Sequence, residues 1–338
     1  MDACSILFFF AFLLFRFELE NEQDTTVNTG PLTQSTHHVM LVRPESFGFN
    51  EETAQNNLFQ TLDPSMDPAE ISDQALREFE EFVSVLTFHG LDVTVIDDTP
   101  TPPKPDAVFP NNWFSTHHDG TLVTYPLFAE SRRAERREDI LKKLAERFVI
   151  SRHVKLESEE QHSRFLEGTG SVVFDHQNRI ALACHSPRTD EQVFRKLCYE
   201  LAYRPVLFRA SDPYHNPIYH TNVVMNVGHS YAIVCLEVIR DDSEVNALRY
   251  LFEQHGKEVV EISLSQMFSF AGNMLQVRNY KGESLIIASE QAYQSLTHIQ
   301  LLQLEKHSRF VYADIDTIET YGGGGARCMV AEIFLPPK

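Results

Sequence analysis

The residue best placed for chemistry in this chain is Cys328, which follows four glycines, Gly322 to Gly325, and precedes an apolar segment. Glycines let the backbone approach a ligand closely and adopt dihedral angles that other residues avoid. Arg327, beside the cysteine, would favour the thiolate, which is the nucleophilic form. Cys328 is therefore a candidate nucleophile. The alternative from these residues alone is a buried thiol after a flexible turn.

A thiol nucleophile needs a proton shuttle and a group that orients the shuttle. His220, in the segment 219–222, and Glu167, in the segment 165–171, supply those residue types. Each is weak evidence alone, because a buried histidine with one hydrogen bond is common and Glu167-Gly168 also suits a simple turn. Their positions within an internal repeat make a shared site the better interpretation.

The repeat is an apolar strand, a short turn, a second strand, a helical stretch and a further strand, and it occurs four times. Its first strands begin near Asn112, Ser171, Asn222 and Asn273, at intervals of 59, 51 and 51 residues, and a further 55 residues reach Cys328. Polar residues at these strand starts therefore occupy one phase of the repeat.

Turn and cap signals delimit the elements of each unit. The hairpin turns are expected at 119–120, 175–178, 228–229 and 281–282. The helices are expected at 131–148, 190–201, 242–255 and 290–302, and the strands after them at 205–208, 259–262 and 310–313.

A fifth unit has a strand at 38–43, a helix at 73–89 and a strand at 93–96, and lacks one hairpin strand. The terminal strand 329–334 would supply it. The sequence thus predicts an α/β fold of five ββαβ units closed into a five-bladed propeller, with the strand starts converging on its axis. The alternative is an open α/β sheet.

Composition indicates the kind of ligand. The 48 acidic and 29 basic residues give a formal charge of −19, which argues against nucleic-acid phosphates or an anionic membrane as partners and favours a small molecule. The five cysteines form no CxxC pair, and their odd number indicates reduced thiols. The fifteen histidines show no metal-ligand spacing, so no metal site is expected.

The N-terminus permits several interpretations. Residues 6–15 form an apolar run of signal-peptide length without a basic start or a small-residue cleavage site, and 21–35 read as a polar linker. A signal peptide, a membrane-proximal anchor and a non-native extension remain open. We predict that residues 1–35 lie outside the fold, that 36–338 form one catalytic domain, and that the protein is cytoplasmic, or secreted if residues 1–20 act as a signal peptide.

Three segments resemble the pentein superfamily of guanidino-group-modifying enzymes: Val42-Arg-Pro44, Pro105-Asp-Ala-Val-Phe-Pro-Asn-Asn-Trp-Phe-Ser-Thr116 and Gly325-Ala-Arg-Cys-Met329. The likeness, over about 36–336, is greatest to citrulline-utilisation hydrolases and eukaryotic-type dimethylargininases, relatives of arginine deiminase. It implies the five-bladed fold and hydrolysis of a terminal C–N bond in a guanidino or ureido group.

The resemblance also implies roles for the catalytic residues. Cys328 would attack the central carbon, and His220 would protonate the departing nitrogen and then activate the water that hydrolyses the covalent adduct. Glu167 would bind substrate nitrogens or steer His220. Its motif, Glu167-Gly-Thr-Gly170, keeps the carboxylate but lacks the aspartate of relatives. No cofactor is required, because thiolate and imidazole perform the chemistry.

Two arginines are candidates for holding the substrate's α-carboxylate, which a guanidinium binds through two hydrogen bonds. Arg188 lies in a sequence similar to the family's Ser-x-Arg-Thr clamp. Arg133, with Arg132, resembles a second family pair, although this arginine-rich stretch would also fit a solvated helix face. Asn222, in phase with the strand starts, is assigned to substrate binding as well.

Asn111 and Asn112 stand where several relatives carry an aspartate that grips a cationic guanidinium. Neutral amides suit a neutral ureido group, although Asp106 would offer a carboxylate nearby. Citrulline is therefore placed ahead of dimethylarginine and arginine. The alternatives are an amidinotransferase with the same nucleophile, and a non-catalytic pentein-fold binding protein, against which the set Cys328, His220 and Glu167 speaks. The sequence does not indicate the oligomeric state.

Overall fold

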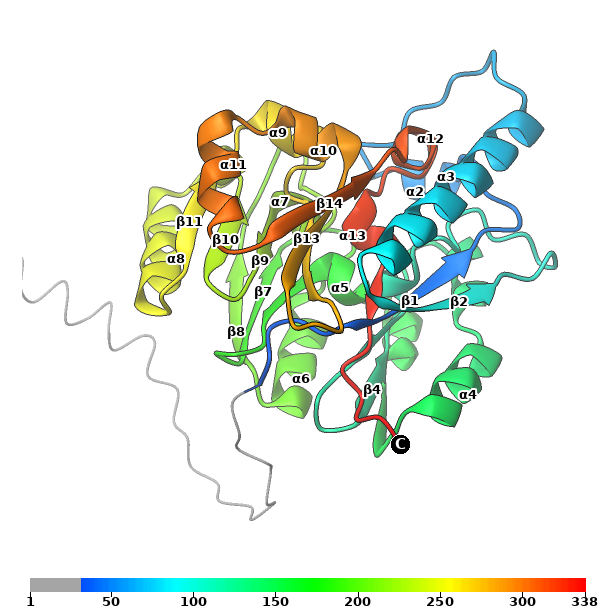
Figure 1. Ribbon diagram of the computed structural model, residues 1–338, viewed down its shortest axis with the longest axis horizontal. Helices are drawn as coiled ribbons and strands as arrows, with labels where there is room; N and C mark the ends of the chain where they lie inside the picture. The colour runs from blue at the N-terminus through cyan, green and yellow to red at the C-terminus, as the bar shows by residue number, and fades with distance from the viewer. Residues whose placement is uncertain (1–31) are drawn as a thin grey trace, which may run out of the picture. The chain divides into compact units, whose positions relative to one another are not determined.

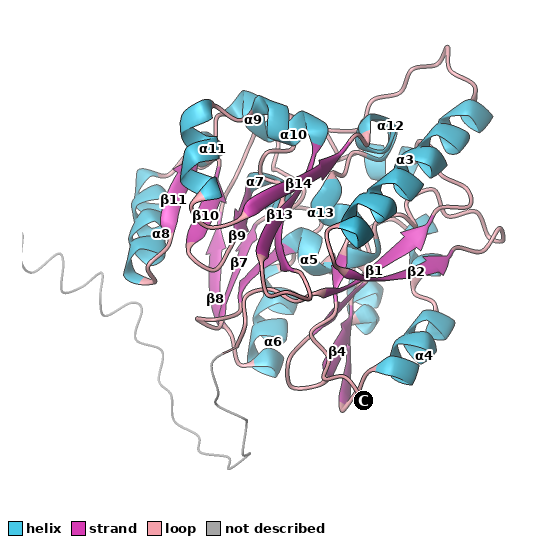
Figure 2. Ribbon diagram, in the orientation of Figure 1, coloured by secondary structure: helices cyan, strands magenta, loops and turns pink. Residues whose placement is uncertain are grey.

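Five three-stranded sheets, each with helical connections, make up residues 32–338, the part of the chain that the computed structural model describes (Figure 1). The predicted apolar run at 6–15 and most of the predicted linker lie outside the described residues. In Figure 2 the long helices lie around the outside and the strands on the inside. This is the expected α/β propeller of the pentein class.

Four of the sheets follow one topology, in which the first strand is antiparallel to the second and the second is parallel to the third. These blades are β3 (Phe114–Thr116), β4 (Thr121–Thr124) and β5 (Arg152–Lys155); β6 (Val172–Asp175), β7 (Ile180–Cys184) and β8 (Arg204–Phe208); β9 (Met225–Val227), β10 (Tyr231–Val234) and β11 (Glu258–Glu261); and β12 (Leu275–Arg278), β13 (Ser284–Ser289) and β14 (Arg309–Ala313).

The fifth blade joins the two ends of the fold. β1 (His38–Arg43) pairs in parallel with β2 (Asp92–Asp97) and antiparallel with β15 (Ala331–Glu332), where Val39 faces Glu332. The predicted closure by the C-terminal strand is confirmed, but β15 has only two residues instead of the expected 329–334.

The main helices are α3 (Pro68–Phe88), α4 (Glu138–Arg147), α6 (Glu191–Leu201), α8 (Asp242–Gln254), α10 (Glu290–Ser295) and α11 (His298–Glu305). Two stretches expected as single helices are interrupted. The stretch expected at 131–148 divides into η2 (Ser131–Glu135) and α4, and the stretch expected at 290–302 divides into α10 and α11. Thr297 begins α11 with a capping box, because its side chain accepts from the backbone of Gln300 and the Gln300 side chain returns the bond.

Single helical turns precede the inner strands and were not expected. They are η1 (Pro110–Asn112), α5 (Gly168–Ser171), α7 (Thr221–Val224) and α13 (Ala326–Met329). α5 contacts both η1 and α7, and α13 contacts η1, so the turns gather at the centre of the molecule (Figure 1). Cys328 therefore lies in a helical turn and not at the head of a strand.

The remaining short α-helices are α2 (Glu51–Ala54), α9 (Leu264–Phe268) and α12 (Asp316–Gly322), which ends in the glycine run. Inner strand β9 contacts β6 and β12, and β15 contacts β3, so neighbouring blades pack through their inner strands. Every residue of β7 and of β10 is buried. The core thus packs between blades and holds the central turns in place.

The described chain enters the fold slightly before the expected boundary at Thr36. Nε2 of Gln34 donates to the carbonyls of Phe174 and Val227, both at 2.9 Å, and its Oε1 accepts from the backbone of His176. Gln34 is buried, so at least part of the segment predicted as linker packs against the propeller. Within residues 32–338 we find no helix with the length and apolar character that crossing a membrane would need.

Candidate active site

Cys328 is buried at the centre of the ring, and two asparagine amides face its sulfur. Nδ2 of Asn273 lies 3.3 Å from Sγ, and Nδ2 of Asn222 lies 3.5 Å from it. Burial raises the pKa of the Cys328 thiol, while both amides and the charges of Arg327 and Arg132 act in the opposite direction. The resting thiol is therefore protonated at neutral pH, with donors already arranged around the thiolate that forms from it.

His220 and Glu167 come from adjacent blades and meet inside the protein. Nε2 of His220 lies 2.8 Å from Oε2 of Glu167, whose other oxygen accepts from the backbone of Phe128. Burial lowers the pKa of His220 to about 4 against the opposing effect of Glu167. Burial would raise the pKa of Glu167, but Arg188, His220 and Arg132 hold it well below its ordinary value.

These protonation states fix the tautomer of His220. An ionised Glu167 can only accept, so Nε2 carries the proton and Nδ1 keeps a free lone pair. Gly170 leaves room beside Nδ1, because a Cβ there would lie 2.7 Å from that atom and 2.6 Å from Nδ2 of Asn112. His220 is thus prepared to accept a proton at Nδ1.

Arg188 is 2% exposed and links the site to the segment that covers it, residues 50–57. Its Nη1 lies 3.3 Å from Oε2 of Glu167, its Nη2 donates to the carbonyl of Thr53 at 2.7 Å, and its Nε donates to Asn56 at 2.7 Å. The guanidinium also stacks 4.9 Å from the ring centre of Tyr219. Two of its donors are therefore held by the covering segment.

The structure places Arg132 in the site and Arg133 outside it, which corrects the assignment of Arg133. Arg132 is 3% exposed, donates to Oδ1 of Asn112 at 2.7 Å and pairs with Glu135 at 2.8 Å. Arg133 donates to the carbonyl of Leu127, pairs with Glu160 at 3.3 Å and does not line the cavity in front of the thiol.

The polar residues expected to hold the substrate head lie together. Nδ2 of Asn112 donates to Oδ1 of Asn111 at 3.1 Å, and the Asp106 carboxylate accepts from Asn50 at 2.6 Å. Burial raises the pKa of Asp106, and the Arg132 guanidinium, whose Nε lies 3.7 Å away, opposes that shift. Asn112 and Asp106 line the cavity in front of the thiol, whereas Asn111 does not.

That cavity has a volume of about 10 Å³, enough for one water molecule. Besides the residues above it is lined by Thr53, Asn57, Phe109, Tyr219 and Gly322 to Gly324. The glycines explain the close approach, because a Cβ on Gly324 would lie 3.1 Å from Cβ of Cys328 and 2.9 Å from the Phe109 ring. Gly323 also has φ +65°, a conformation that glycine adopts without strain.

Sequence reasoning missed parts of this site. Asn273 occupied the correct phase of the repeat but received no role, although its amide contacts the thiol. Thr53, Asn57 and Asn56 lie in the connection between β1 and α3, which has no counterpart in the repeat, so no signal identified them. Within the described residues, no group of three or more His, Cys, Asp or Glu side chains is arranged to hold a metal ion.

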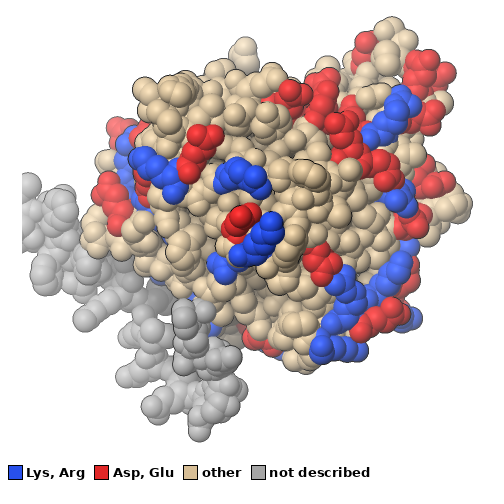
Figure 3. Space-filling model, viewed as in Figure 1, with Lys and Arg blue, Asp and Glu red and all other residues tan. Residues whose placement is uncertain are grey.

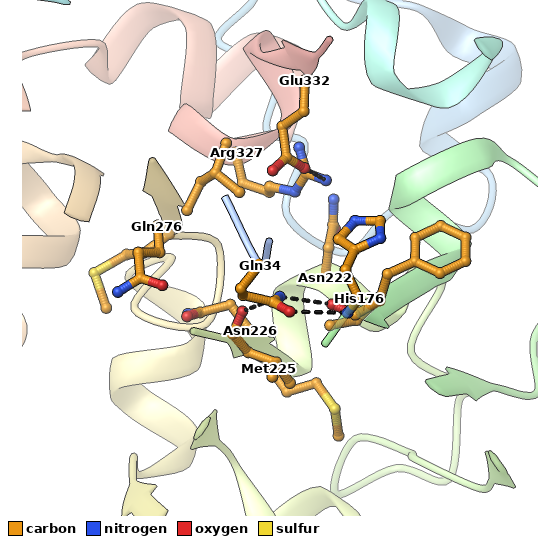
Figure 4. Close-up of a pocket in the computed structure, with 13 residues that line it drawn as sticks. Gln34, His176, Asn222, Met225, Asn226, Gln276, Arg327 and Glu332 are labelled. Carbon is orange, nitrogen blue, oxygen red and sulfur yellow. Dashed lines mark hydrogen bonds and ion pairs between the residues drawn. The ribbon is translucent and has the colours of Figure 1, made fainter. Parts of the chain in front are cut away.

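A second cavity, of about 30 Å³, lies beside Asn222 (Figure 4). Gln34, Asn226 and Gln276 line it, and Figure 4 shows Arg327 and Glu332 facing each other at its edge, where their ion pair measures 2.9 Å. Arg327 therefore directs its guanidinium to Glu332 and not to the thiol. It influences Cys328 only through its charge.

Five ββαβ blades closed around a central site define the pentein class, and this chain is of that class. The family model described as N,N dimethylarginine dimethylhydrolase, eukaryotic, matches residues 43–335. The chain belongs to that family.

Solved structures show the same fold at low sequence identity. ArgZ, an arginine dihydrolase from the ornithine-ammonia cycle in cyanobacteria, superposes with a TM-score of 0.69 at 14% identity, over 88% of this chain and 41% of that one. Its N-terminal domain, bound to substrate, gives the same score and is covered to 98%. A dimethylarginine dimethylaminohydrolase adduct gives a TM-score of 0.62 at 16% identity, over 88% of this chain and 99% of that one. A search of curated protein sequences finds no match. At 41% coverage, the chain spans less than half of the ArgZ chain in the first of these structures.

Proposed function

We propose that this hydrolase cleaves a terminal C–N bond in the guanidinium of a free arginine derivative through a covalent adduct on Cys328, with dimethylarginine as the first candidate. The observation that carries the proposal is that Cys328 and His220 line one cavity, and that His220 is paired with the buried carboxyl of Glu167 behind it. The family's dimethylarginine hydrolysis supports the substrate class.

In the first half of the reaction, the Cys328 thiolate forms a C–S bond to the guanidinium carbon. The proton from the thiol passes to Nδ1 of His220, and the resulting imidazolium is stabilised by Glu167, which holds Nε2. His220 then protonates the departing nitrogen, the C–N bond breaks, and dimethylamine leaves. The product of this half is an amidino group bound to sulfur.

In the second half, a water molecule attacks the same carbon. Neutral His220 takes one proton from the water, the C–S bond breaks, and His220 returns that proton to the thiolate, while the second proton of the water is released to solvent as the C=O bond forms. The released product carries a ureido group, which for dimethylarginine is citrulline. The ArgZ N-terminal domain has been solved with a covalently bound reaction intermediate, which supports an adduct of this kind in the fold.

The charge of the site favours a cationic substrate. Arg132 is balanced by Glu135 and Asp106, and Arg188 by Glu167, so ionisation of all three acids leaves one carboxylate in excess. Burial raises the pKa of Glu135 to about 7, with the charges of Asp106 and Glu167 adding to the effect and Arg132 opposing it, so a bound cation would favour the ionised form of Glu135. A guanidinium would supply the missing positive charge and would lower the pKa of the neighbouring Cys328 thiol.

Citrulline is the second candidate substrate, and one observation favours it. The side chains at the expected head-group position are the neutral amides of Asn111 and Asn112, which match a neutral ureido group. A ureido group, however, brings no charge to ionise a thiol whose pKa burial has raised. This second argument places the cationic guanidines ahead of citrulline, reversing the order suggested by the amides alone.

The amino-acid end of the substrate is assigned to Arg188. Its bonds to Thr53 and Asn56 belong to the covering segment, and a substrate α-carboxylate would replace them when that segment moves. The segment has to move, because a cavity of about 10 Å³ does not admit an amino acid. Arg132 is instead held by Glu135 and positions Asn112.

The expected partner is a small molecule rather than a nucleic acid. On the face shown in Figure 3, Lys and Arg side chains lie among Asp and Glu side chains. That distribution, with the formal charge of −19, supports the prediction that polyanions are not ligands.

A substrate panel tests the proposal. Purified protein is incubated with dimethylarginine, arginine and citrulline, and dimethylamine, ammonia, citrulline and ornithine are measured, with Cys328→Ser as the blank. We expect dimethylamine and citrulline from dimethylarginine. Turnover of citrulline alone would select the second candidate, and turnover of none of the three would refute the proposal.

A further inference from the structure

Two buried acceptor groups lie beside the nucleophile without a hydrogen-bond partner among the described residues. They are Oδ1 of Asn273 and both carboxyl oxygens of Glu319. Asn273 is 0% exposed and Glu319 is 2% exposed. An unpaired buried acceptor is unfavourable, so this arrangement calls for a donor between them.

The orientation of the Asn273 amide is fixed by its other contacts. Nδ2 lies 3.1 Å from the backbone carbonyl of Asn222, which can only accept, and 3.3 Å from Sγ of Cys328. The nitrogen must therefore face the thiol, and Oδ1 must face the opposite way. On that side lies Gly325.

The Glu319 carboxyl and Oδ1 of Asn273 both lie next to Gly325. A Cβ on Gly325 would lie 3.0 Å from Oδ1 of Asn273 and 3.0 Å from Oε1 of Glu319. The two oxygens are thus separated by no more than twice that distance. That range includes the separations of a direct hydrogen bond and of one bridging water, and a side chain at position 325 would enter the space that borders both oxygens.

The surroundings of Glu319 keep its proton in place. Burial raises the pKa of Glu319 to about 8, and the negative charges of Asp316, Asp314 and, on α3, Glu78 add to this effect, while the nearby Ser289 hydroxyl of β13, which makes no hydrogen bond to the carboxyl, opposes it. A protonated carboxyl has an O–H donor, whereas a carboxylate facing an amide oxygen has none.

We propose that Glu319 is a positioning residue that, as a neutral carboxylic acid, donates a hydrogen bond directly or through one water to Oδ1 of Asn273, and thereby holds the amide that faces Cys328. The inference rests on the proposed function only in taking Cys328 as the nucleophile. A single proton on the Glu319 carboxyl gives Oδ1 of Asn273 a hydrogen-bond donor and brings the carboxyl into the same bond. Polarisation of the amide by Glu319 strengthens the bond from Nδ2 to the thiolate.

The test measures thiol reactivity without a substrate. Alkylation of Cys328 by iodoacetamide is followed by mass spectrometry across pH in the wild type, Glu319→Gln and Glu319→Leu, with Cys328→Ser as the blank. Gln keeps a donor but cannot ionise, and Leu has no donor. At neutral pH we expect Glu319→Leu to react roughly tenfold more slowly, the effect of one hydrogen bond, and Glu319→Gln to react like the wild type.

The pH profile separates positioning from a merely structural role. Above the pKa of about 8, ionised Glu319 loses its donor, so the wild-type rate should fall below that of Glu319→Gln. Superimposable profiles of these two proteins, or equal slowing in Glu319→Gln and Glu319→Leu, would overturn the inference.

If Glu319→Leu does not fold, the isosteric Glu319→Gln variant still decides the matter. Its infrared difference spectrum against the wild type near neutral pH should contain a protonated-carboxyl band, and absence of that band also overturns the inference. A failed substrate panel would leave these results intact, so the inference and the proposed function fail separately.

Discussion

Nε2 of His220 lies 2.8 Å from Oε2 of Glu167, and both side chains are almost completely shielded from solvent. The contact joins a histidine whose pKa burial lowers to a carboxylate that its cationic neighbours keep ionised. The imidazole is therefore neutral before the reaction, and the carboxylate is ready to stabilise the imidazolium that forms when the thiol gives up its proton.

The first prediction concerns this pair. Glu167→Gln keeps the shape of the side chain but removes the charge that stabilises imidazolium, so kcat should fall by roughly 10²-fold or more. Steady-state kinetics with the preferred substrate measure the effect, and circular dichroism checks folding. Glu130→Gln, at a side chain that is 82% exposed, is the matched control and should change nothing. An unaltered kcat in Glu167→Gln would contradict the assigned role.

A second prediction follows from the buried, protonated thiol. A cationic haloacetamidine should lower the pKa of Cys328 as it binds, whereas a neutral haloacetamide should not. The ratio of their alkylation rates at Cys328 should exceed the ratio for a free thiol such as glutathione by roughly tenfold, the effect of one pKa unit. Equal ratios would mean that the site does not use the charge of its ligand.

The fold was predictable where its signals are local. Strand β1 occupies the expected residues 38–43, and the helix from Asp190 begins where its cap indicated, since the Asp190 side chain accepts from the backbones of Gln192 and Val193. The central helical turns were missed because three or four residues are too few to show a helical period and their apolar neighbours resemble a buried strand.

The site was predictable where the repeat places it. Phase alone brought together Cys328, His220, Asn222 and Asn112. Phase does not decide between adjacent residues, and on a 3₁₀ turn one position rotates a side chain by about 120°. That rotation separates Arg132, which enters the site, from Arg133, which pairs with Glu160 outside it.

The third prediction tests substrate anchoring at Arg188. Arg188→Lys keeps the charge but loses the planar pair of donors, so KM should rise by roughly tenfold while kcat changes less. Arg133→Lys is the matched control, because Arg133 lies outside the cavity, and its kinetics should equal those of the wild type. An unchanged KM in Arg188→Lys would move the carboxylate site elsewhere.

The fourth prediction concerns stability and pH. The pKa of Glu319 is raised to about 8 in the folded protein from its ordinary value of 4.5, so the folded state holds a proton that the unfolded chain loses. The stability contributed by this group therefore falls as pH rises from 4.5 to about 8, by roughly 1.4 kcal/mol per pH unit.

Glu319→Gln removes the loss of folding stability that Glu319 causes as pH rises, because glutamine does not ionise. Urea unfolding should show the variant to be more stable than the wild type, with a difference that grows between pH 5 and 8, within the range set by these pKa values. Glu305→Gln, at an exposed position, controls for the loss of one charge and should give a constant difference. A pH-independent gain in Glu319→Gln would show that its carboxyl is not held neutral.

The last prediction asks which head group the site prefers. Asn112 lines the cavity, and its Oδ1 accepts from Arg132, a bond that aspartate would also make. Asn112→Asp would add a negative charge beside the reacting group and should raise kcat/KM for dimethylarginine relative to citrulline by roughly tenfold, the size expected for a charge-assisted hydrogen bond. Competition between the two substrates in one reaction measures the ratio directly. Asn111→Asp, whose side chain does not line the cavity, is the comparison. A fall in the ratio would show that the amide at Asn112, and not the net charge of the site, determines substrate choice.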